Sequence, residues 1–138
     1  MKSLLIALLI VGAASCKKEN VNNSKTPADP EKMYGKWTWV SSMGGFAGKT
    51  TTPQSAGYQA GIEFKRDKTV SFYRNDTLTN TAEFNLAKGK SIFSADSAYI
   101  IKYKPDAMDQ AIIKTKTDTL ILADNVYDGF TITYVRDK

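Results

Sequence analysis

Cysteine and histidine carry out much of the covalent and metal chemistry of proteins, and this chain has one cysteine and no histidine. The absence of histidine excludes Ser-His and Cys-His catalysis, histidine-ligated zinc and histidine pH switches. The single cysteine, Cys16, excludes an intramolecular disulfide. No pair of carboxylates has a spacing typical of a general acid and base. We therefore expect no enzyme activity, no metal and no cofactor.

The single thiol stands where a lipid would be attached. A positively charged start, an unbroken apolar run over residues 4–11 and four small residues precede Cys16. This order is typical of a secretory signal, and the run is shorter than the ~20 residues of a membrane-spanning helix. Ala13-Ala14-Ser15-Cys16 resembles a bacterial lipobox, although Ala13 stands where Leu is usual. We predict a lipoprotein signal peptide at 1–15 and a lipidated Cys16; a short membrane anchor is the alternative.

Residues 16–32 are polar, with two prolines and one large aliphatic residue. Such a segment cannot bury enough apolar surface to fold, so we predict a flexible tether. The folded domain is expected at 33–138. Lipid on Cys16 would hold it in the bacterial cell envelope, with the outer membrane as the expected site, on its periplasmic or surface face.

The chain has 19 Lys and Arg against 14 Asp and Glu, a net charge of +5. In the expected domain the basic residues are scattered, and Lys102-Tyr103-Lys104 places two of them on one face of a strand, as on a wet outer surface. No basic stripe is interleaved with aromatic residues, which argues against a nucleic-acid partner. We expect a monomer whose partners are the membrane and a small hydrophobic ligand.

From Tyr34 onward, short segments of alternating apolar residues recur, and no apolar repeat of 3.6 residues persists over ten residues. Alternation with period two is typical of strands, so the sequence predicts an all-β domain. A turn is expected at Lys88-Gly89-Lys90, and residues 91–93 are either a short strand or an irregular link. The eight expected strands are 36–43, 61–65, 69–74, 77–86, 98–104, 110–116, 119–123 and 130–136.

Eight strands can close into a barrel just wide enough for packed side chains or one small ligand. The short hairpins between successive strands favour an up-and-down antiparallel β-barrel, which leaves no exposed edge. A β-sandwich built from the same strands is the alternative.

Two motifs at the ends of the domain resemble those of lipocalins. Gly35-Lys36-Trp37 is similar to the G-x-W motif that opens the first strand of that family, and Arg136 is similar to its closing arginine. The resemblance implies a lipocalin-like barrel closed at one end by Gly35, Trp37 and Arg136, with the guanidinium over the indole. The segment 125–130 and the glycines after the first strand further resemble lipid-anchored lipocalin-like domains of bacterial envelopes.

Aromatic residues at inward positions are the candidates for a cavity wall, and each of them also suits an ordinary core. The loop at 44–57 is the one long loop early in the domain, and the resemblance implies a lid there, with Phe46 as an apolar plug. A disordered surface loop is the alternative. The cavity candidates are Trp39, Phe46, Phe64, Phe72, Phe84 and Tyr134.

The expected function is non-covalent binding or carriage of a small, partly apolar molecule by an envelope lipoprotein. The alternative is a protein-interaction module, an inhibitor or accessory subunit of an envelope complex, with a barrel filled by its own side chains. Bulky rings at most inward positions favour the alternative. The interior volume of the barrel therefore separates the two functions.

Overall fold

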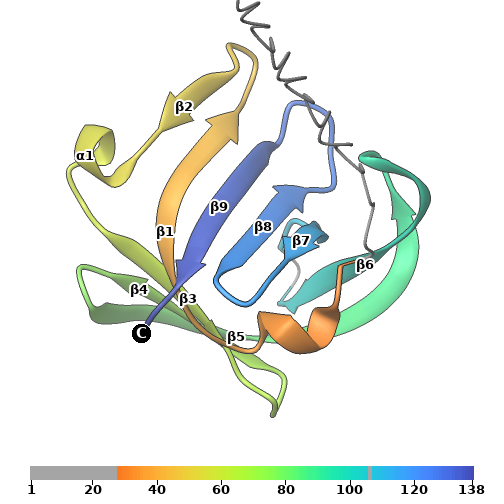
Figure 1. Ribbon diagram of the computed structural model, residues 1–138, viewed down its shortest axis with the longest axis horizontal. Helices are drawn as coiled ribbons and strands as arrows, with labels where there is room; N and C mark the ends of the chain where they lie inside the picture. The colour runs from red at the N-terminus through yellow and green to blue at the C-terminus, as the bar shows by residue number, and fades with distance from the viewer. Residues whose placement is uncertain (1–27, 106) are drawn as a thin grey trace, which may run out of the picture.

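The computed structural model describes residues 28–105 and 107–138, which form a β-barrel (Figure 1). The signal peptide predicted at 1–15, Cys16 and most of the predicted tether lie outside the described residues. The described elements include two short helices, η1 (Pro30–Met33) and α1 (Pro53–Ala56), and no described helix is long and apolar enough to span a bilayer. The strands are β1 (Gly35–Gly44), β2 (Lys49–Thr51), β3 (Ala60–Phe64), β4 (Thr69–Arg74), β5 (Thr77–Ser91), β6 (Ser94–Lys104), β7 (Gln110–Thr115), β8 (Thr119–Asp124) and β9 (Phe130–Arg136).

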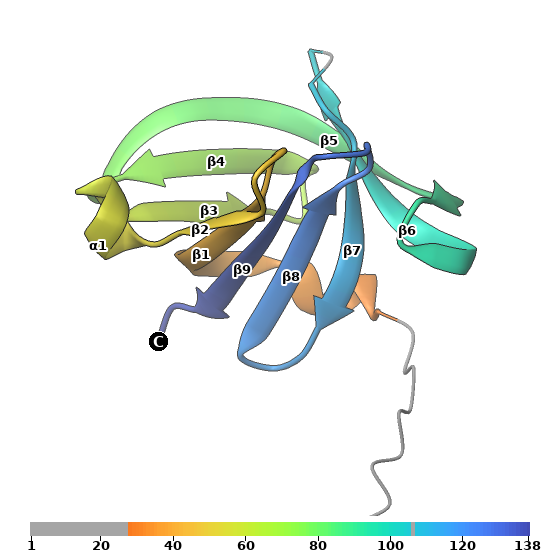
Figure 2. The ribbon, with the colours of Figure 1, turned by 90° about the horizontal axis from the view of Figure 1, so that it is seen from above.

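The sheet closes on itself because β1 pairs along both of its edges. Each strand from β3 to β9 is antiparallel to the next, β9 pairs with β1, and β2 is an extra strand beside β1. Trp37 consequently lies opposite both Ile62 of β3 and Arg136 of β9. The long, curved β5 pairs with β4 along its first half and with β6 along its second (Figure 2). This closed antiparallel barrel of eight strands confirms the predicted fold and excludes the β-sandwich.

The hydrophobic core fills the end of the barrel at which Trp37 lies. The two-residue period of the strands turns Ile62 and Phe64 of β3, and Leu120 and Leu122 of β8, toward the inside, where they are almost completely buried. Burial of each such side chain contributes ~1.5–3 kcal/mol. The closed end is thus packed with side chains.

The hairpin between β5 and β6 is longer than the sequence predicts. The turn expected at Lys88-Gly89-Lys90 is wrong, because these residues continue β5, and the chain reverses only at Ile92-Phe93. Gly89 lies opposite Ala98, and the register shifts between Gly89 and Ser91. A glycine can mark a β-bulge as well as a turn, and here it marks the bulge.

The segment 44–57, expected to be structureless, contains β2 and α1. Thr52 caps α1 in a reciprocal capping box with Ser55, and Pro53 occupies the first turn. Gly57 ends the helix with a φ of +75°, which glycine adopts without strain. A Thr-Pro start and a glycine stop are helix signals in the sequence, so this element was predictable.

Residues 28–32, the end of the predicted tether, pack against the barrel. Asp29 caps η1, and its backbone N–H donates to Thr115 Oγ1 at 2.8 Å. Met33 is fully buried, and its carbonyl accepts the indole N–H of Trp37 at 2.7 Å. The pair Asp29-Pro30, an N-cap followed by proline, was the signal in the sequence for this short helix.

Candidate ligand-binding cavity

Arg136 closes the end of the barrel at which Trp37 lies. Its guanidinium stands over the Trp37 ring, 4.0 Å from the centroid. It also donates to three carbonyl oxygens, those of Lys32 at 2.7 Å, Tyr34 at 3.0 Å and Thr117 at 2.6 Å. The side chain therefore ties η1, the start of β1 and the β7–β8 turn to the last strand, and it faces away from the open end.

Gly35 leaves the space that this guanidinium occupies. Its φ is +119°, and a Cβ built on it would stand 2.7 Å from Nη1 of Arg136. Both the backbone conformation and the close approach require glycine at this position.

We expect Gly35→Ala to lower the free energy of unfolding by about 2–3 kcal/mol, because backbone strain and displacement of the guanidinium act together. Gly48→Ala is the matched control, since Gly48 has a φ of +59° but open space around it. Its cost should be about 1 kcal/mol. Urea denaturation measures both variants, and equal losses would contradict a close contact between Gly35 and Arg136.

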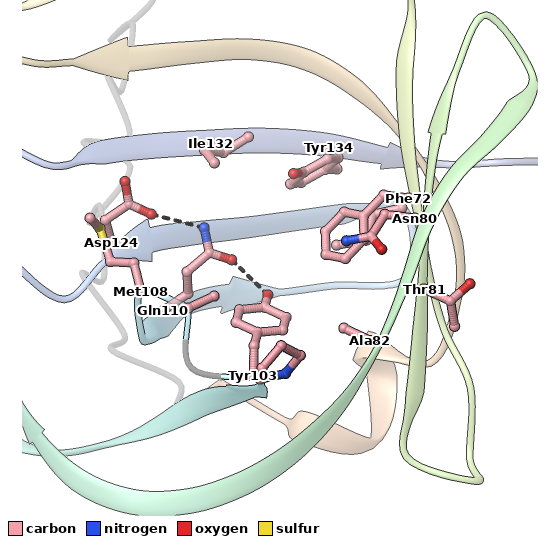
Figure 3. Close-up of a pocket in the computed structure, with 13 residues that line it drawn as sticks. Phe72, Asn80, Thr81, Ala82, Tyr103, Met108, Gln110, Asp124, Ile132 and Tyr134 are labelled. Atoms are coloured by element: carbon pink, nitrogen blue, oxygen red, sulfur yellow. Dashed lines mark hydrogen bonds between the residues drawn. The ribbon is translucent and has the colours of Figure 1, made fainter.

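The opposite end of the barrel holds a cavity of about 520 Å³ (Figure 3). This volume falls within the range of small-molecule sites, ~300–1,000 Å³. Strands β3 to β9 all contribute to the wall, as does the β6–β7 loop. The wall is apolar at Ile62, Phe72, Ala82, Pro105, Ala107, Met108 and Ile132, and it is polar at Asn80, Thr81, Tyr103, Gln110, Asp124 and Tyr134.

A second hollow, of about 650 Å³, lies where β6 and β7 separate beyond Ile100. The N-terminal segment Ala28–Pro30 forms part of its wall, together with Tyr99 of β6 and Ile112 of β7. The cavity at the open end is instead bounded by inward-facing side chains of the barrel itself. We therefore place the candidate site at the open end.

A chain of hydrogen bonds crosses one wall of the open-end cavity. The Tyr103 hydroxyl donates to Gln110 Oε1 at 2.7 Å, and Gln110 Nε2 donates to Asp124 Oδ1 at 2.9 Å. The second carboxylate oxygen of Asp124 accepts the backbone N–H of Phe130 at 2.9 Å. Figure 3 shows that these three side chains come from β6, β7 and β8 and face the same space as Tyr134.

Two phenols of this wall have strongly raised pKa values. Burial is the main cause for both Tyr103 and Tyr134. For Tyr103, the neighbouring Tyr134 raises the pKa further, and the negative charge of Asp124 acts on both. Both hydroxyls therefore stay protonated wherever the barrel is folded at ordinary pH.

These pKa directions predict a loss of stability at alkaline pH. Above pH ~10 the unfolded chain ionises its tyrosines while the folded chain keeps these two protonated, so the free energy of unfolding falls. In a spectrophotometric titration, at least two of the seven tyrosines should ionise only as the protein unfolds. The double variant Tyr103→Phe/Tyr134→Phe should flatten the decline. Ionisation of all seven near pH 10 without loss of structure would contradict the prediction.

The structure separates the six cavity candidates. Phe72 and Tyr134 line the cavity. Phe64 and Phe84 belong to the solid core. Trp39 lies opposite Tyr134 in the β1–β9 register, but its ring stacks on Tyr58 and its Nε1 donates to Ser42. Phe46, at the β1–β2 turn, is fully exposed. In this structure neither Phe46 nor Trp39 forms part of the wall of the open-end cavity.

Sequence reasoning missed the polar residues Tyr103, Gln110 and Asp124. Tyr103 lay unnoticed between two lysines whose outward position implied that it faces inward. Asp124 ends β8, and it accepts the Phe130 N–H across the turn that follows. Polar residues at inward-facing positions of neighbouring strands were therefore the sequence feature that could have indicated this part of the cavity wall.

Comparisons with protein-family models, with curated proteins and with solved structures find no match to this chain. Among the described residues, no three His, Cys, Asp or Glu side chains gather closely enough to hold a metal ion.

Proposed function

We propose that this protein is a lipid-anchored lipoprotein of the bacterial cell envelope whose barrel binds or carries a small, partly apolar molecule. The observation that carries the proposal is the cavity of about 520 Å³ at the open end, with apolar walls and a few polar groups. A barrel filled by its own side chains would have no such space. The proposal includes membership of the lipocalin-like domains, which the glycine, tryptophan and arginine of the closed end support.

The binding function is tested with a fluorescent fatty-acid probe and a panel of lipids, haem and pigments. We expect at least one of these to bind with a dissociation constant in the micromolar range, and Phe72→Ala to weaken it about tenfold, because Phe72 lines the cavity. Phe46→Ala is the matched control, since it removes the same ring from an exposed turn. Absence of binding across the whole panel and to a long-chain alkylamine would reject the function.

The anchor is tested separately with Cys16→Ser. We expect the unaltered chain to incorporate radiolabelled palmitate and to fractionate with the outer membrane. The variant should incorporate none and should either become soluble or remain as an uncleaved precursor. Unchanged membrane retention in a chain that incorporates no palmitate would reject lipidation of Cys16.

A second candidate function, as an interaction module, is favoured by exposed apolar side chains beside the cavity mouth. Phe46 and Tyr127 are largely exposed on the β1–β2 and β8–β9 turns. These turns are neighbours, because the Gly45 N–H donates to the Gly129 carbonyl. A stoichiometric envelope partner that is lost in Phe46→Ala/Tyr127→Ala, with no ligand binding, would support this function instead.

A further inference from the structure

Asp124 is the only charged residue among the described residues that line the open-end cavity. Its oxygens accept hydrogen bonds from Gln110 Nε2 and from the Phe130 backbone, both neutral donors. It forms no ion pair with any lysine or arginine of the described ranges. Within the described part of the wall, the partners of the Asp124 carboxylate are thus neutral hydrogen-bond donors, with no basic side chain among them.

The hydrogen-bond chain determines which polar groups of the cavity wall can still accept a hydrogen bond from a ligand. An ionised carboxylate only accepts, so Gln110 must turn its amide N–H toward Asp124 and its oxygen toward Tyr103. The Tyr103 hydroxyl then has to donate its proton to Gln110. What remains free on Tyr103 and Asp124 is acceptor capacity. The Tyr134 hydroxyl lines the same cavity and can either accept or donate a hydrogen bond.

Aromatic rings lie beside the Asp124 carboxylate in the cavity wall. Phe72 and Tyr103 lie with their ring centroids 6.3 Å apart, and Tyr134 faces the same space (Figure 3). Asp124 is linked to Tyr103 through Gln110, and both Asp124 and Tyr134 line the same cavity. The faces of aromatic rings attract cations, most strongly where water is partly excluded.

We infer that the cavity takes a cationic molecule, an amine or quaternary ammonium on a small apolar body, rather than a fatty acid. A bound ammonium would meet the Asp124 carboxylate, free oxygen lone pairs and aromatic rings. A bound carboxylate would meet a like charge in a partly enclosed space. This inference rests on the proposed binding function, and it names the class of ligand for that site.

The test compares decylamine, decanol and decanoic acid, which share one apolar chain and differ only in the head group. Isothermal titration is carried out on the full chain carrying Cys16→Ser. We expect decylamine to bind about tenfold more tightly than decanol, and decanoic acid to bind most weakly. Water-soluble dihexanoyl-phosphatidylethanolamine is a fourth arm; binding of it instead of decylamine would assign the ammonium to a lipid headgroup.

Asp124→Asn, made in the same background, should abolish the preference for decylamine over decanol. Asp128→Asn is the matched control, because it removes the same charge from the adjacent turn, outside the cavity wall, and should leave the preference unchanged. If Asp124→Asn fails to fold, the order of affinities for the three ligands on the chain carrying Cys16→Ser alone still tests the inference.

The outcomes separate this inference from the proposed function. Equal binding of the three decyl compounds, tighter binding of the acid, or an amine preference that survives Asp124→Asn would overturn the inference while leaving a ligand-binding barrel. Failure of all three and of the phospholipid to bind would overturn the inference, and the panel of lipids, haem and pigments would then decide whether the cavity binds any ligand.

Discussion

Replacing Arg136 by methionine should lower the free energy of unfolding by about 2–4 kcal/mol. Methionine keeps an unbranched apolar stem but removes the guanidinium from the Trp37 ring and from three carbonyl oxygens. A hydrogen bond to a charged donor contributes ~1.5–3 kcal/mol, yet two of the three carbonyls are exposed and can be rehydrated. The expected loss is therefore smaller than the sum of three such bonds.

Arg74→Met is the matched control for this experiment. The Arg74 guanidinium also stands over an aromatic ring, 4.1 Å from the centroid of Tyr58, but it lies on the exposed end of β4. Its removal should cost less than ~1 kcal/mol. Urea denaturation followed by tryptophan fluorescence measures both losses. Similar small losses for the two variants would mean that Arg136 packs on the indole without tying η1 to the barrel.

The closed end of the barrel could be predicted from the sequence because closure itself constrains it. In a closed barrel the first and last strands are neighbours, so a tryptophan near the start of one and an arginine near the end of the other must meet. The register places Trp37 directly opposite Arg136. The hydrogen bonds of Arg136 to η1 were not predictable, since Lys32 was assigned to the tether.

The open end could be predicted only in part. Strand alternation tells which residues face inward, but it does not tell how deep each one lies along the barrel axis. Phe64, Phe72 and Phe84 therefore look equivalent in the sequence, although only Phe72 lines the cavity. Depth depends on the register of neighbouring strands, and the bulge in β5 and the late turn after it shift that register.

The length of β5 is one physical reason why the cavity wall was not recognised. Its first half pairs with β4 and its second half with β6, so one strand lines both sides of the interior. The chain of hydrogen bonds also depends on three strands, because Tyr103 lies on β6, Gln110 on β7 and Asp124 on β8. Pairings between residues this far apart in sequence are not encoded in local propensity.

Phe84→Ala should lower the free energy of unfolding by about 3–5 kcal/mol and leave the choice of ligand unchanged. The Phe84 ring is fully buried and meets Phe64 edge to face, with 5.3 Å between the centroids. Its removal leaves a void at the solid end of the barrel, away from the open-end cavity. Phe72→Ala should cost less stability but weaken ligand binding, because the half-buried Phe72 ring borders the open-end cavity.

The pair of variants therefore tests whether the barrel has a solid end and a functional end. Phe72→Ala should cost only about 1–2 kcal/mol, since part of its surface is already in contact with the cavity, but it should weaken ligand binding. Urea denaturation and titration with decylamine measure the two properties on the same preparations. If Phe84→Ala weakens binding as much as Phe72→Ala at a temperature where both remain folded, the division between the two ends does not hold. If it does hold, the aromatic residues at the closed end stabilise the fold, and Phe72 at the open end contributes to binding instead.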